Sequence, residues 1–321
     1  DLSRHPAVIE AAQRAIAEYG VSATASPRTS GHLAIHEQLE RALAEFLGKG
    51  DVVLVAAGYL APLAALTTLS ADHDVVVVAP QSHAAIADAV VATGLPPRSM
   101  GECRPGTVTR PLLVTAGLDW SGQVAPLQDY WRRSQATGGR LVVDEAHATG
   151  ILGPQGRGSV EWAGIEDPEV VLTGSLAKAL GAAGGFVAGT DAFIRRLRGA
   201  NRSYAAATAL APALAAAALA ALRIVQREPE RRARLHENAT ALRQRLRARG
   251  LSVTDEAGPS VVPARFDPEL TRRIHESLRA SGFLVSLIGS PYAPDGPRLR
   301  FVAKAGHTEA DYDRLLSAMP R

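Results

Sequence analysis

The chain has 321 residues, which is enough for one large domain and a smaller second one. Hydrophobic residues make up 46% and charged residues 21%, a balance that fits a folded enzyme and excludes a disordered chain. The net charge is only +3, and the arginines near residues 231–249 follow a helical pattern, so we expect a solvated helix face and no nucleic-acid partner.

Short runs rich in Val and Leu alternate with helical stretches over the first two thirds of the chain. The predicted strands are Val52–Val55, Asp74–Val78, Leu112–Thr115, Leu141–Asp144, Val170–Thr173 and Gly185–Ala188. Helices are predicted between them, for example at His83–Ala92 and Ala125–Ala136. This alternation is typical of an α/β fold with a mostly parallel sheet covered by helices.

A long helical segment, from about Ala211 to Arg249 with a break near Pro229, leads to a second region. Strands are predicted there at Ser252–Thr254, Ser260–Arg265, Leu284–Leu287 and Arg298–Val302, and helices at Glu269–Ser281 and Thr308–Met319. We therefore expect an N-terminal segment (1–30), a large domain (31–225) and a small α+β C-terminal domain (226–321).

Two long uncharged stretches, Val52–Ala71 and Ser203–Leu222, have the length of a membrane span. Glycine, proline and a high alanine content make both better suited to buried elements of a large core, so no membrane partner is expected. The single cysteine, Cys103, excludes an internal disulfide, offers no metal cluster and favours a reducing cytoplasm. No signal peptide is visible at the start, which is Asp1 and not Met.

Asp144 and Lys178 carry the strongest chemical signal. Asp144 ends one hydrophobic run, and Lys178 closely follows the next. A lysine amine can form a Schiff base with the aldehyde of pyridoxal phosphate, and a carboxylate can keep the pyridine nitrogen protonated so that the ring accepts electrons. The pair therefore predicts carbanion chemistry at the α-carbon of an amino acid.

Further polar groups are predicted at the same sheet edge, where ligands of open α/β sheets gather. Ser175 and the amides after Gly58, beside Tyr59, could hold a phosphate, and His83 could stack on a flat ring. Each also has a simpler interpretation, since Ser175 and His83 could merely cap helices. The sequence contains no Gly-x-x-x-x-Gly-Lys-Ser/Thr loop, no His-Glu-x-x-His and no Gly-x-Ser-x-Gly. It therefore lacks the motifs of P-loop nucleotide-binding proteins, of zinc metalloproteases and of serine hydrolases.

Several short motifs are spread over almost the whole chain. They are Ser30-Gly31, His36-Glu-Gln-Leu-Glu40, Ala57-Gly58-Tyr59, Ser82-His83, the string Asp144-Glu-Ala-His-Ala-Thr-Gly-Ile-Leu-Gly-Pro-Gln-Gly-Arg-Gly158, and Gly174-Ser-Leu-Ala-Lys-Ala-Leu-Gly181. Together these motifs resemble the α-oxoamine synthases, which are pyridoxal phosphate enzymes of fold type I. The long string from Asp144 to Gly158 is the most specific of them.

The resemblance implies roles for individual residues. Lys178 would be the Schiff-base lysine, Asp144 the pyridinium partner, His147 the group bonding the ring oxygen, and His83 the stacked imidazole. It further implies that Ser175, Gly58 and Tyr59 lie on the phosphate side, that Thr208 reaches the phosphate from a neighbouring subunit of a homodimer, and that Arg300 binds the substrate carboxylate, with Tyr292 near the acyl chain.

The implied reaction condenses a small amino acid with an acyl thioester, of coenzyme A or of an acyl carrier protein, and releases an α-aminoketone after decarboxylation. The pattern is closest to the members that use L-alanine and a pimeloyl thioester. The segment Thr115–Gly122 departs from the family, with Ala116 in place of a Glu and Ser121 as a shifted counterpart of its Ser. A sibling with other substrates, a cofactor-binding subunit without turnover and an aminotransferase therefore remain alternatives.

Overall fold

The computed structural model describes residues 2–264, 267–290 and 292–320, in which the chain forms two compact units. The first unit runs to Asp119 and resumes at Ala125–Arg227; the second consists of Trp120–Val124 and the chain from Glu228 onward. The segment Trp120–Val124 thus leaves the first unit and returns to it. The three-part division expected from the sequence stays a prediction.

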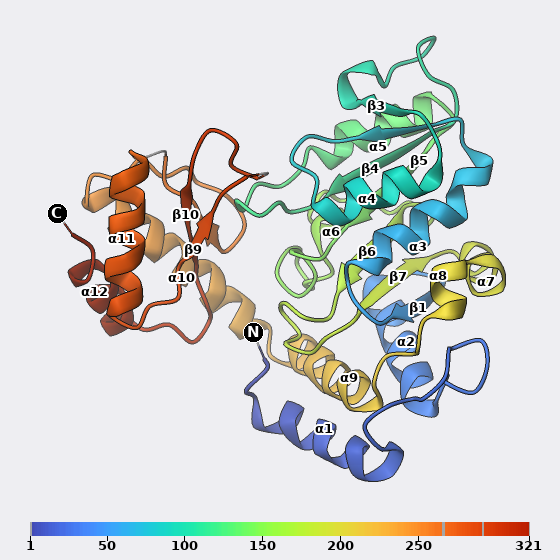
Figure 1. The fold of residues 1–321 in the computed structure, drawn as a ribbon, viewed down its shortest axis with the longest axis horizontal. Helices are drawn as coiled ribbons and strands as arrows, with labels where there is room; N and C mark the ends of the chain where they lie inside the picture. Colours follow the sequence, from blue (N-terminus) through green and yellow to red (C-terminus); the bar gives the residue numbers. More distant parts are fainter. Residues whose placement is uncertain (1, 265–266, 291, 321) are drawn as a thin grey trace. The chain divides into compact units, whose positions relative to one another are not determined.

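One large sheet organises the first unit. Its strands are β1 (Asp51–Val55), β2 (Val75–Val78), β3 (Pro97–Ser99), β4 (Pro111–Ala116), β5 (Arg140–Asp144), β6 (Val171–Ser175) and β7 (Gly185–Gly189). They lie in the order β1-β7-β6-β5-β4-β2-β3 (Figure 1). Strand β7 is antiparallel to β1 and β6, and the remaining pairs are parallel. The predicted mostly parallel α/β sheet is confirmed. Strand β3 was missed because its three residues are exposed and one is a proline.

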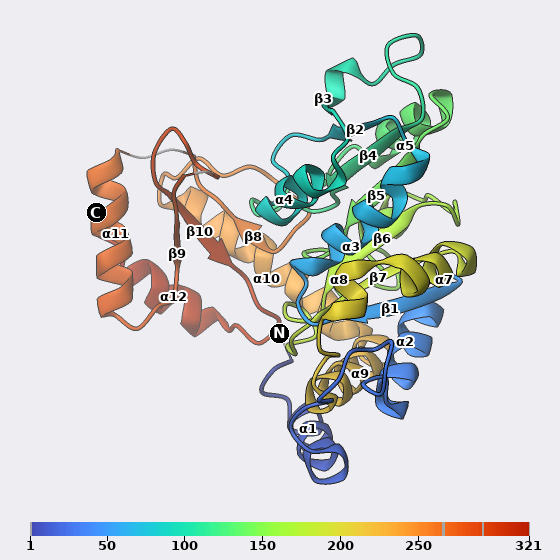
Figure 2. The same cartoon turned by 45° about the vertical axis from the view of Figure 1, so that its right-hand side comes forward.

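Helices cover both faces of this sheet (Figure 2). They are α1 (Pro6–Tyr19), α2 (Ala34–Leu47), α3 (Leu60–Leu69), α4 (Ala84–Thr93), α5 (Leu127–Ala136), α6 (Ser159–Trp162), α7 (Asp191–Ala200), α8 (Arg202–Ala206) and α9 (Pro212–Arg227). Side chains of successive strand residues point to opposite faces, so Val52 and Leu54 join an apolar layer with α1, α2, α5 and α9. Val53 and Val55 join a second layer with α3, α4 and α7.

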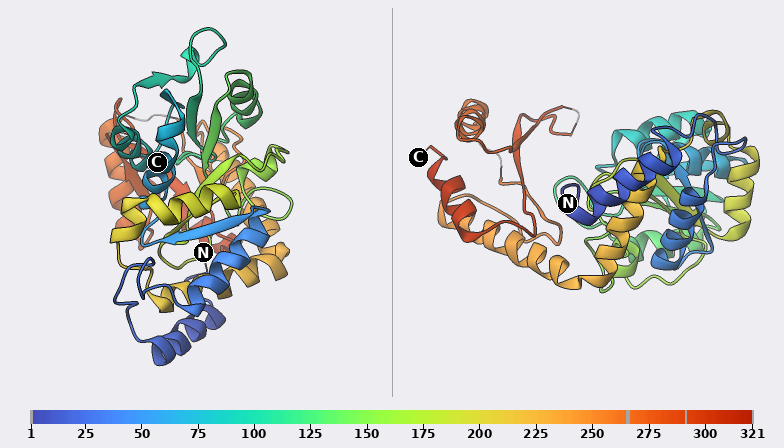
Figure 3. Two further views of the ribbon diagram at one scale, coloured as in Figure 1. Left: turned by 90° about the vertical axis from the view of Figure 1, so that its right-hand side faces the viewer. Right: turned by 90° about the horizontal axis from the view of Figure 1, so that it is seen from below.

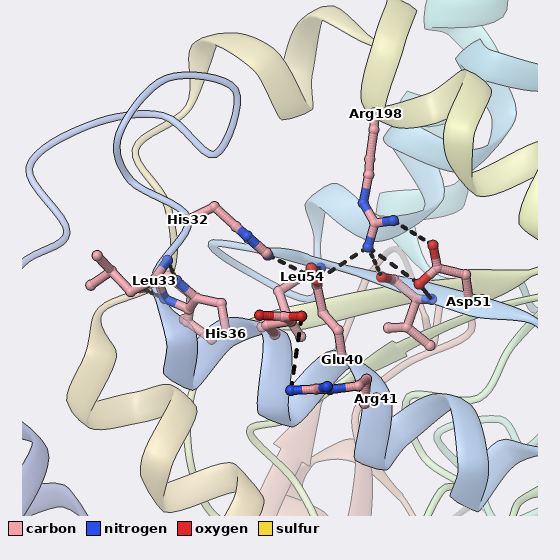
Figure 4. A network of polar contacts seen from close by, with 11 residues as sticks. His32, Leu33, His36, Glu40, Arg41, Asp51, Leu54 and Arg198 are labelled. Carbon is pink, nitrogen blue, oxygen red and sulfur yellow. Dashed lines mark hydrogen bonds and ion pairs between the residues drawn. The ribbon is translucent and has the colours of Figure 1, made fainter.

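A network of polar groups fastens α2 to β1 and α7 (Figure 4). The buried Glu40 carboxylate accepts hydrogen bonds from His32 Nε2 at 2.9 Å, Arg198 Nη2 at 3.1 Å and the Leu54 backbone N–H at 3.2 Å. Arg198 also pairs with Asp51 at the start of β1. A buried carboxylate is tolerated only with such partners. Glu40, the last residue of the His36–Glu40 motif, therefore has a structural role.

The second unit is a small antiparallel sheet with helices on one face (Figure 3). Its elements are α10 (Pro229–Ala248), β8 (Ser260–Val261), α11 (Pro268–Ala280), β9 (Ser286–Ile288), β10 (Arg298–Val302) and α12 (Glu309–Ser317), with the strand order β8-β10-β9. Leu299 and Phe301 of β10 are buried with the helices. The alternation of side chains places Arg298, Arg300 and Val302 on the opposite face.

Three strands predicted for this unit differ in the structure. Ser252–Thr254 is not a strand, because the Val253 carbonyl accepts from the Arg247 side chain at 2.8 and 2.9 Å and not from a neighbouring strand. The predicted strand Ser260–Arg265 ends at Val261, since Pro263 has no N–H for a ladder; Arg265 lies outside the described residues. Strand β9 starts two residues later than the predicted Leu284.

The two uncharged stretches form parts of the core. Residues 52–71 resolve into β1, a turn and α3, and residues 203–222 lie in α8, a connecting loop and α9. Within the described ranges, none of the helices combines the length and the hydropathy that a membrane crossing requires.

Candidate active site

The candidate site lies at the edge of the large sheet where the parallel strands end. Gly58 and Tyr59 follow β1, His83 follows β2, Asp144 is the last residue of β5, and Ser175 is the last residue of β6. Strands β2, β4, β5 and β6 are mutually parallel, and β1 points the same way because both it and β6 are antiparallel to β7. Their carboxyl ends therefore meet at one edge, where ligands of α/β folds bind.

Asp144 contributes a buried carboxyl group. Its Oδ1 accepts a hydrogen bond from the Ala146 N–H at 3.1 Å. Burial raises the pKa of Asp144 to about 6, although the Ala146 N–H and the positive charge of Lys178 oppose this rise. Thr173 pairs with Asp144 across the sheet, and its buried hydroxyl, close to the carboxyl group, has no partner in hydrogen-bond geometry. A cationic donor placed against this carboxylate would stabilise its charged form.

Lys178 stands in the turn that links β6 to β7. The Gly181 N–H donates to the Lys178 carbonyl at 3.2 Å, and the Leu176 N–H donates to the Gly184 carbonyl at 3.0 Å, so the turn is closed on itself. The side chain of Lys178 is exposed. Its positive charge contributes to the lowered pKa of His83 and opposes the rise in the pKa of Asp144.

His83 caps α4 and presents a neutral imidazole. Its Nδ1 accepts the Ala85 N–H at 3.1 Å, so that nitrogen carries no proton. Burial first, and then the charge of Lys178, lowers the pKa of His83. The Tyr59 ring meets it edge to face, with the ring centroids 6.3 Å apart, and the Tyr59 hydroxyl donates to the Asp88 carboxylate. The simpler interpretation of His83 as a helix cap is confirmed.

Gly58 and Ser175 approach each other closely. A Cβ added to Gly58 would lie 2.8 Å from Ser175 Cβ and 2.9 Å from Ser175 Oγ, so this turn requires glycine. The Ser175 hydroxyl accepts the Ala177 N–H at 3.2 Å and thereby caps the lysine turn. The N–H groups of residues 60 and 61 already donate to the carbonyls of residues 57 and 58, so two of the expected phosphate donors are used within the turn.

His147 and Thr208 lie in loops of the same unit. His147 is half-buried in the turn that follows β5, three residues after Asp144. Thr208 is exposed between α8 and α9. The neighbouring Ala209 N–H donates to the Ala25 carbonyl at 3.0 Å, which ties this loop to the segment before α2.

Glu145 is an organising residue that sequence reasoning missed. Its buried carboxylate accepts the Ser159 N–H and hydroxyl, both at 2.8 Å, and the Val160 N–H at 2.9 Å. It therefore caps α6 and closes the glycine-rich loop between residues 153 and 158, where a Cβ on Gly158 would meet the same carboxylate at 2.6 Å. Burial raises the pKa of Glu145 to about 7. The sequence gives no local sign of this role, because the partners of Glu145 lie 14 and 15 residues further along the chain.

Two predicted substrate residues belong to the second unit. Arg300, on β10, donates from Nε to Ser260 Oγ at 3.2 Å. Tyr292 is half-buried in the loop between β9 and β10. The structure thus gathers Asp144, Lys178, His83 and the Gly58–Ser175 contact in one unit, and it places Arg300 and Tyr292 in the other.

The groups gathered in the first unit fit pyridoxal phosphate. A flat cationic ring needs a buried carboxylate for its N–H, and Asp144 is one. An aldehyde needs a nearby amine, and the charge of Lys178 acts on that same carboxyl.

Comparisons with known proteins agree with this fit. The model of the family "Aminotransferase class I and II" matches residues 1–106 and 121–319. The 8-amino-7-oxononanoate synthase of Methylococcus capsulatus is 38% identical over 337 residues, covering 99% of this chain and 85% of the relative. The solved serine palmitoyltransferase of Sphingomonas wittichii superposes with a TM-score of 0.92 at 28% identity, covering 99% of this chain and 83% of that one.

A high-resolution structure of SPT with PLP also superposes, with a TM-score of 0.91, 28% identity and the same coverage of both chains. Family model, relatives and neighbours thus span nearly the whole sequence, and this neighbour was solved with PLP. The chain therefore belongs to the aminotransferase class I and II family, and within it to the α-oxoamine synthases, as a pyridoxal phosphate-dependent C-acyltransferase.

Proposed function

We propose that the protein condenses L-alanine with a pimeloyl thioester and releases carbon dioxide and 8-amino-7-oxononanoate, a step of biotin biosynthesis. The observation that carries the proposal is the 38% identity to an 8-amino-7-oxononanoate synthase over 99% of the chain. The cluster of Asp144, Lys178 and His83 supports it, because those groups match the chemistry that such a condensation needs.

Each residue of the cluster has a proposed part in holding the cofactor. Asp144 would keep a proton on the ring nitrogen, His83 would lie against the ring, and His147 would bond the ring oxygen. Ser175, with the turn at Gly58 and Tyr59, would hold the phosphate. Thr208 would reach the phosphate of a neighbouring copy, so the proposal includes a homodimer.

When bound, pyridoxal phosphate supplies a sink for the electron pair left on the α-carbon of the amino acid. Arg300 binds the substrate carboxylate through its planar guanidinium. Lys178 removes the α-proton, the α-carbon attacks the thioester carbonyl, and the thiol leaves. After the carboxylate departs as carbon dioxide, Lys178 returns a proton to the same carbon.

The thioester carbonyl needs a donor as its oxygen gains charge, and His83 and His147 are the two candidates. Coenzyme A and an acyl carrier protein are both open as carriers of the acyl group. The single cysteine, Cys103, which is buried, supports a cytoplasmic location as part of the proposal.

A second candidate is the condensation of L-serine with a palmitoyl thioester. The observation that favours it is the TM-score of 0.92 to a serine palmitoyltransferase. Tyr292 and the altered segment around Trp120 also make the acyl site the least typical part of the chain.

The test is a matrix of L-alanine, glycine and L-serine against pimeloyl and palmitoyl thioesters, with free thiol and product mass as readouts. We expect thiol release and a product of the mass of 8-amino-7-oxononanoate with L-alanine and the pimeloyl thioester, and none with Lys178→Ala. Turnover restricted to L-serine and the palmitoyl thioester would replace the proposal by the second candidate. Amino-group transfer without any thioester would identify an aminotransferase, and cofactor binding without any turnover a non-catalytic subunit.

A further inference from the structure

The guanidinium of Arg300 is held by a hydroxyl within its own sheet. Ser260 of β8 stands opposite Val302 of β10, so Ser260 and Arg300 are diagonal neighbours on the same face. Arg300 Nε donates to Ser260 Oγ at 3.2 Å. Because Nε lies in the plane of the guanidinium, this bond sets the direction in which the fork of the two Nη atoms points.

Ser260 is itself fixed on several sides. It is buried, and its carbonyl accepts from Arg243 Nη2 at 3.3 Å, while the same Nη2 also bonds the Gly258 carbonyl. On another side, Gly122 leaves room for the Ser260 carbonyl, since a Cβ there would lie 2.8 Å from that oxygen. The Gly258 N–H closes the contact by donating to the Gly122 carbonyl at 3.0 Å.

We propose that Ser260 is a positioning residue for Arg300, and that it sets how strongly the enzyme selects amines that carry a carboxylate. The inference rests on the proposed role of Arg300 in substrate binding. A flexible arginine loses side-chain freedom each time it binds, whereas one held at Nε has already lost part of it. A planar fork in a fixed direction also favours the two parallel hydrogen bonds of a carboxylate over the single bond of an alcohol.

The experiment measures binding to the cofactor-loaded protein by the change in visible absorbance. The two probes are L-alanine and L-alaninol, which share the amine and the methyl group but differ in the carboxylate. For Ser260→Ala we expect the dissociation constant of L-alanine to rise about tenfold, the scale of one hydrogen bond to a charged group. The dissociation constant of L-alaninol should stay unchanged, because L-alaninol has no carboxylate that the Arg300 guanidinium could bind.

Two further variants separate positioning from general damage. Ser260→Thr keeps the accepting oxygen and should recover most of the affinity for L-alanine. Ser277→Ala is the matched control in the same unit, since it removes a hydroxyl that donates to the Ala318 carbonyl at 2.8 Å and does not contact Arg300. It should change neither constant.

Equal weakening of L-alanine and L-alaninol in Ser260→Ala, or no weakening of either, overturns the positioning role. This binding comparison uses no acyl thioester, so its result does not depend on which acyl group the enzyme transfers. If the wild type prefers L-alanine and Ser260→Ala loses that preference, while pimeloyl thioester gives no product, the acyl assignment is wrong and the positioning role stands. If product forms at the wild-type KM for L-alanine in Ser260→Ala, the proposed function stands and the positioning role is wrong.

Discussion

Replacing Gly58 by alanine tests whether the contact between the β1 turn and the lysine turn shapes the cofactor site. The new Cβ would lie 2.8 Å from Ser175 Cβ and 3.3 Å from Ser175 Cα, closer than the 3.4 Å at which ordinary van der Waals contact begins. The Gly58 backbone cannot move away from Ser175, because Gly185 packs against its other side. A Cβ added to Gly185 would lie 2.6 Å from Gly58 Cα. Ser175, itself buried, must therefore move.

The size of the effect follows from overpacking. One extra methyl in a site that cannot relax costs about 1–3 kcal/mol. If that strain displaces Ser175 from its proposed position beside the phosphate, the affinity for pyridoxal phosphate falls about tenfold to a hundredfold. If the cofactor-free protein absorbs the strain instead, its free energy of unfolding falls by the same amount.

The assay is a titration of cofactor-free protein with pyridoxal phosphate, together with thermal unfolding of the same samples. Gly199→Ala is the matched control, since that glycine is exposed near the end of α7 and no atom would lie within 4 Å of the added Cβ. The control should bind as the wild type does. Wild-type affinity together with wild-type stability in Gly58→Ala would refute the reasoning.

Three other changes have predictable results. Lys178→Ala should abolish the visible absorbance of the Schiff base and all thiol release while leaving the melting temperature almost unchanged, because this side chain is exposed; retained absorbance would contradict the assignment. Burial raises the pKa of Asp144 to about 6, so cofactor affinity should fall as the pH drops below about 6, when the carboxyl takes up a proton; titrations of Asp144→Asn should lack that dependence and show weaker binding at pH 7. In Glu145→Gln the free energy of unfolding, measured with denaturant, should fall by roughly 1.5–3 kcal/mol. The amide NH₂ takes the place of a carboxylate oxygen that accepts a backbone N–H. Because burial raises the pKa of Glu145 from 4.5 to about 7, the folded wild type holds a proton that the unfolded chain releases, and its stability should fall as the pH rises through that window; a Gln variant with the same fall would disprove the cause.

Secondary structure was predictable where burial is uniform. The valine-rich runs of β1, β2 and β5 were recognised because strands buried on both faces are almost continuously apolar. The predictions were wrong where that signal was weak, as at β3, whose residues are exposed, and at Ser252–Thr254, where an arginine side chain bonds the backbone.

The proposed chemistry was visible in residue types, but the supports of each group were not. Asp144 and Lys178 were noticed because each follows a hydrophobic run. The residues next to Glu145 and Ser260 in the sequence do not indicate that Glu145 closes the glycine-rich loop or that Ser260 bonds Arg300. The bonded partners lie 14 and 40 residues away along the chain.

The sequence by itself determined the fold class, the cofactor and the family, because these depend on local periodicity and on short strings of reactive residues. Tertiary structure alone decided which groups share an environment. The charge of Lys178 acts on both Asp144 and His83 in the folded chain, while burial raises the pKa of Asp144 and lowers that of His83. Such effects depend on distance through space and on the exclusion of water, which a linear sequence does not record.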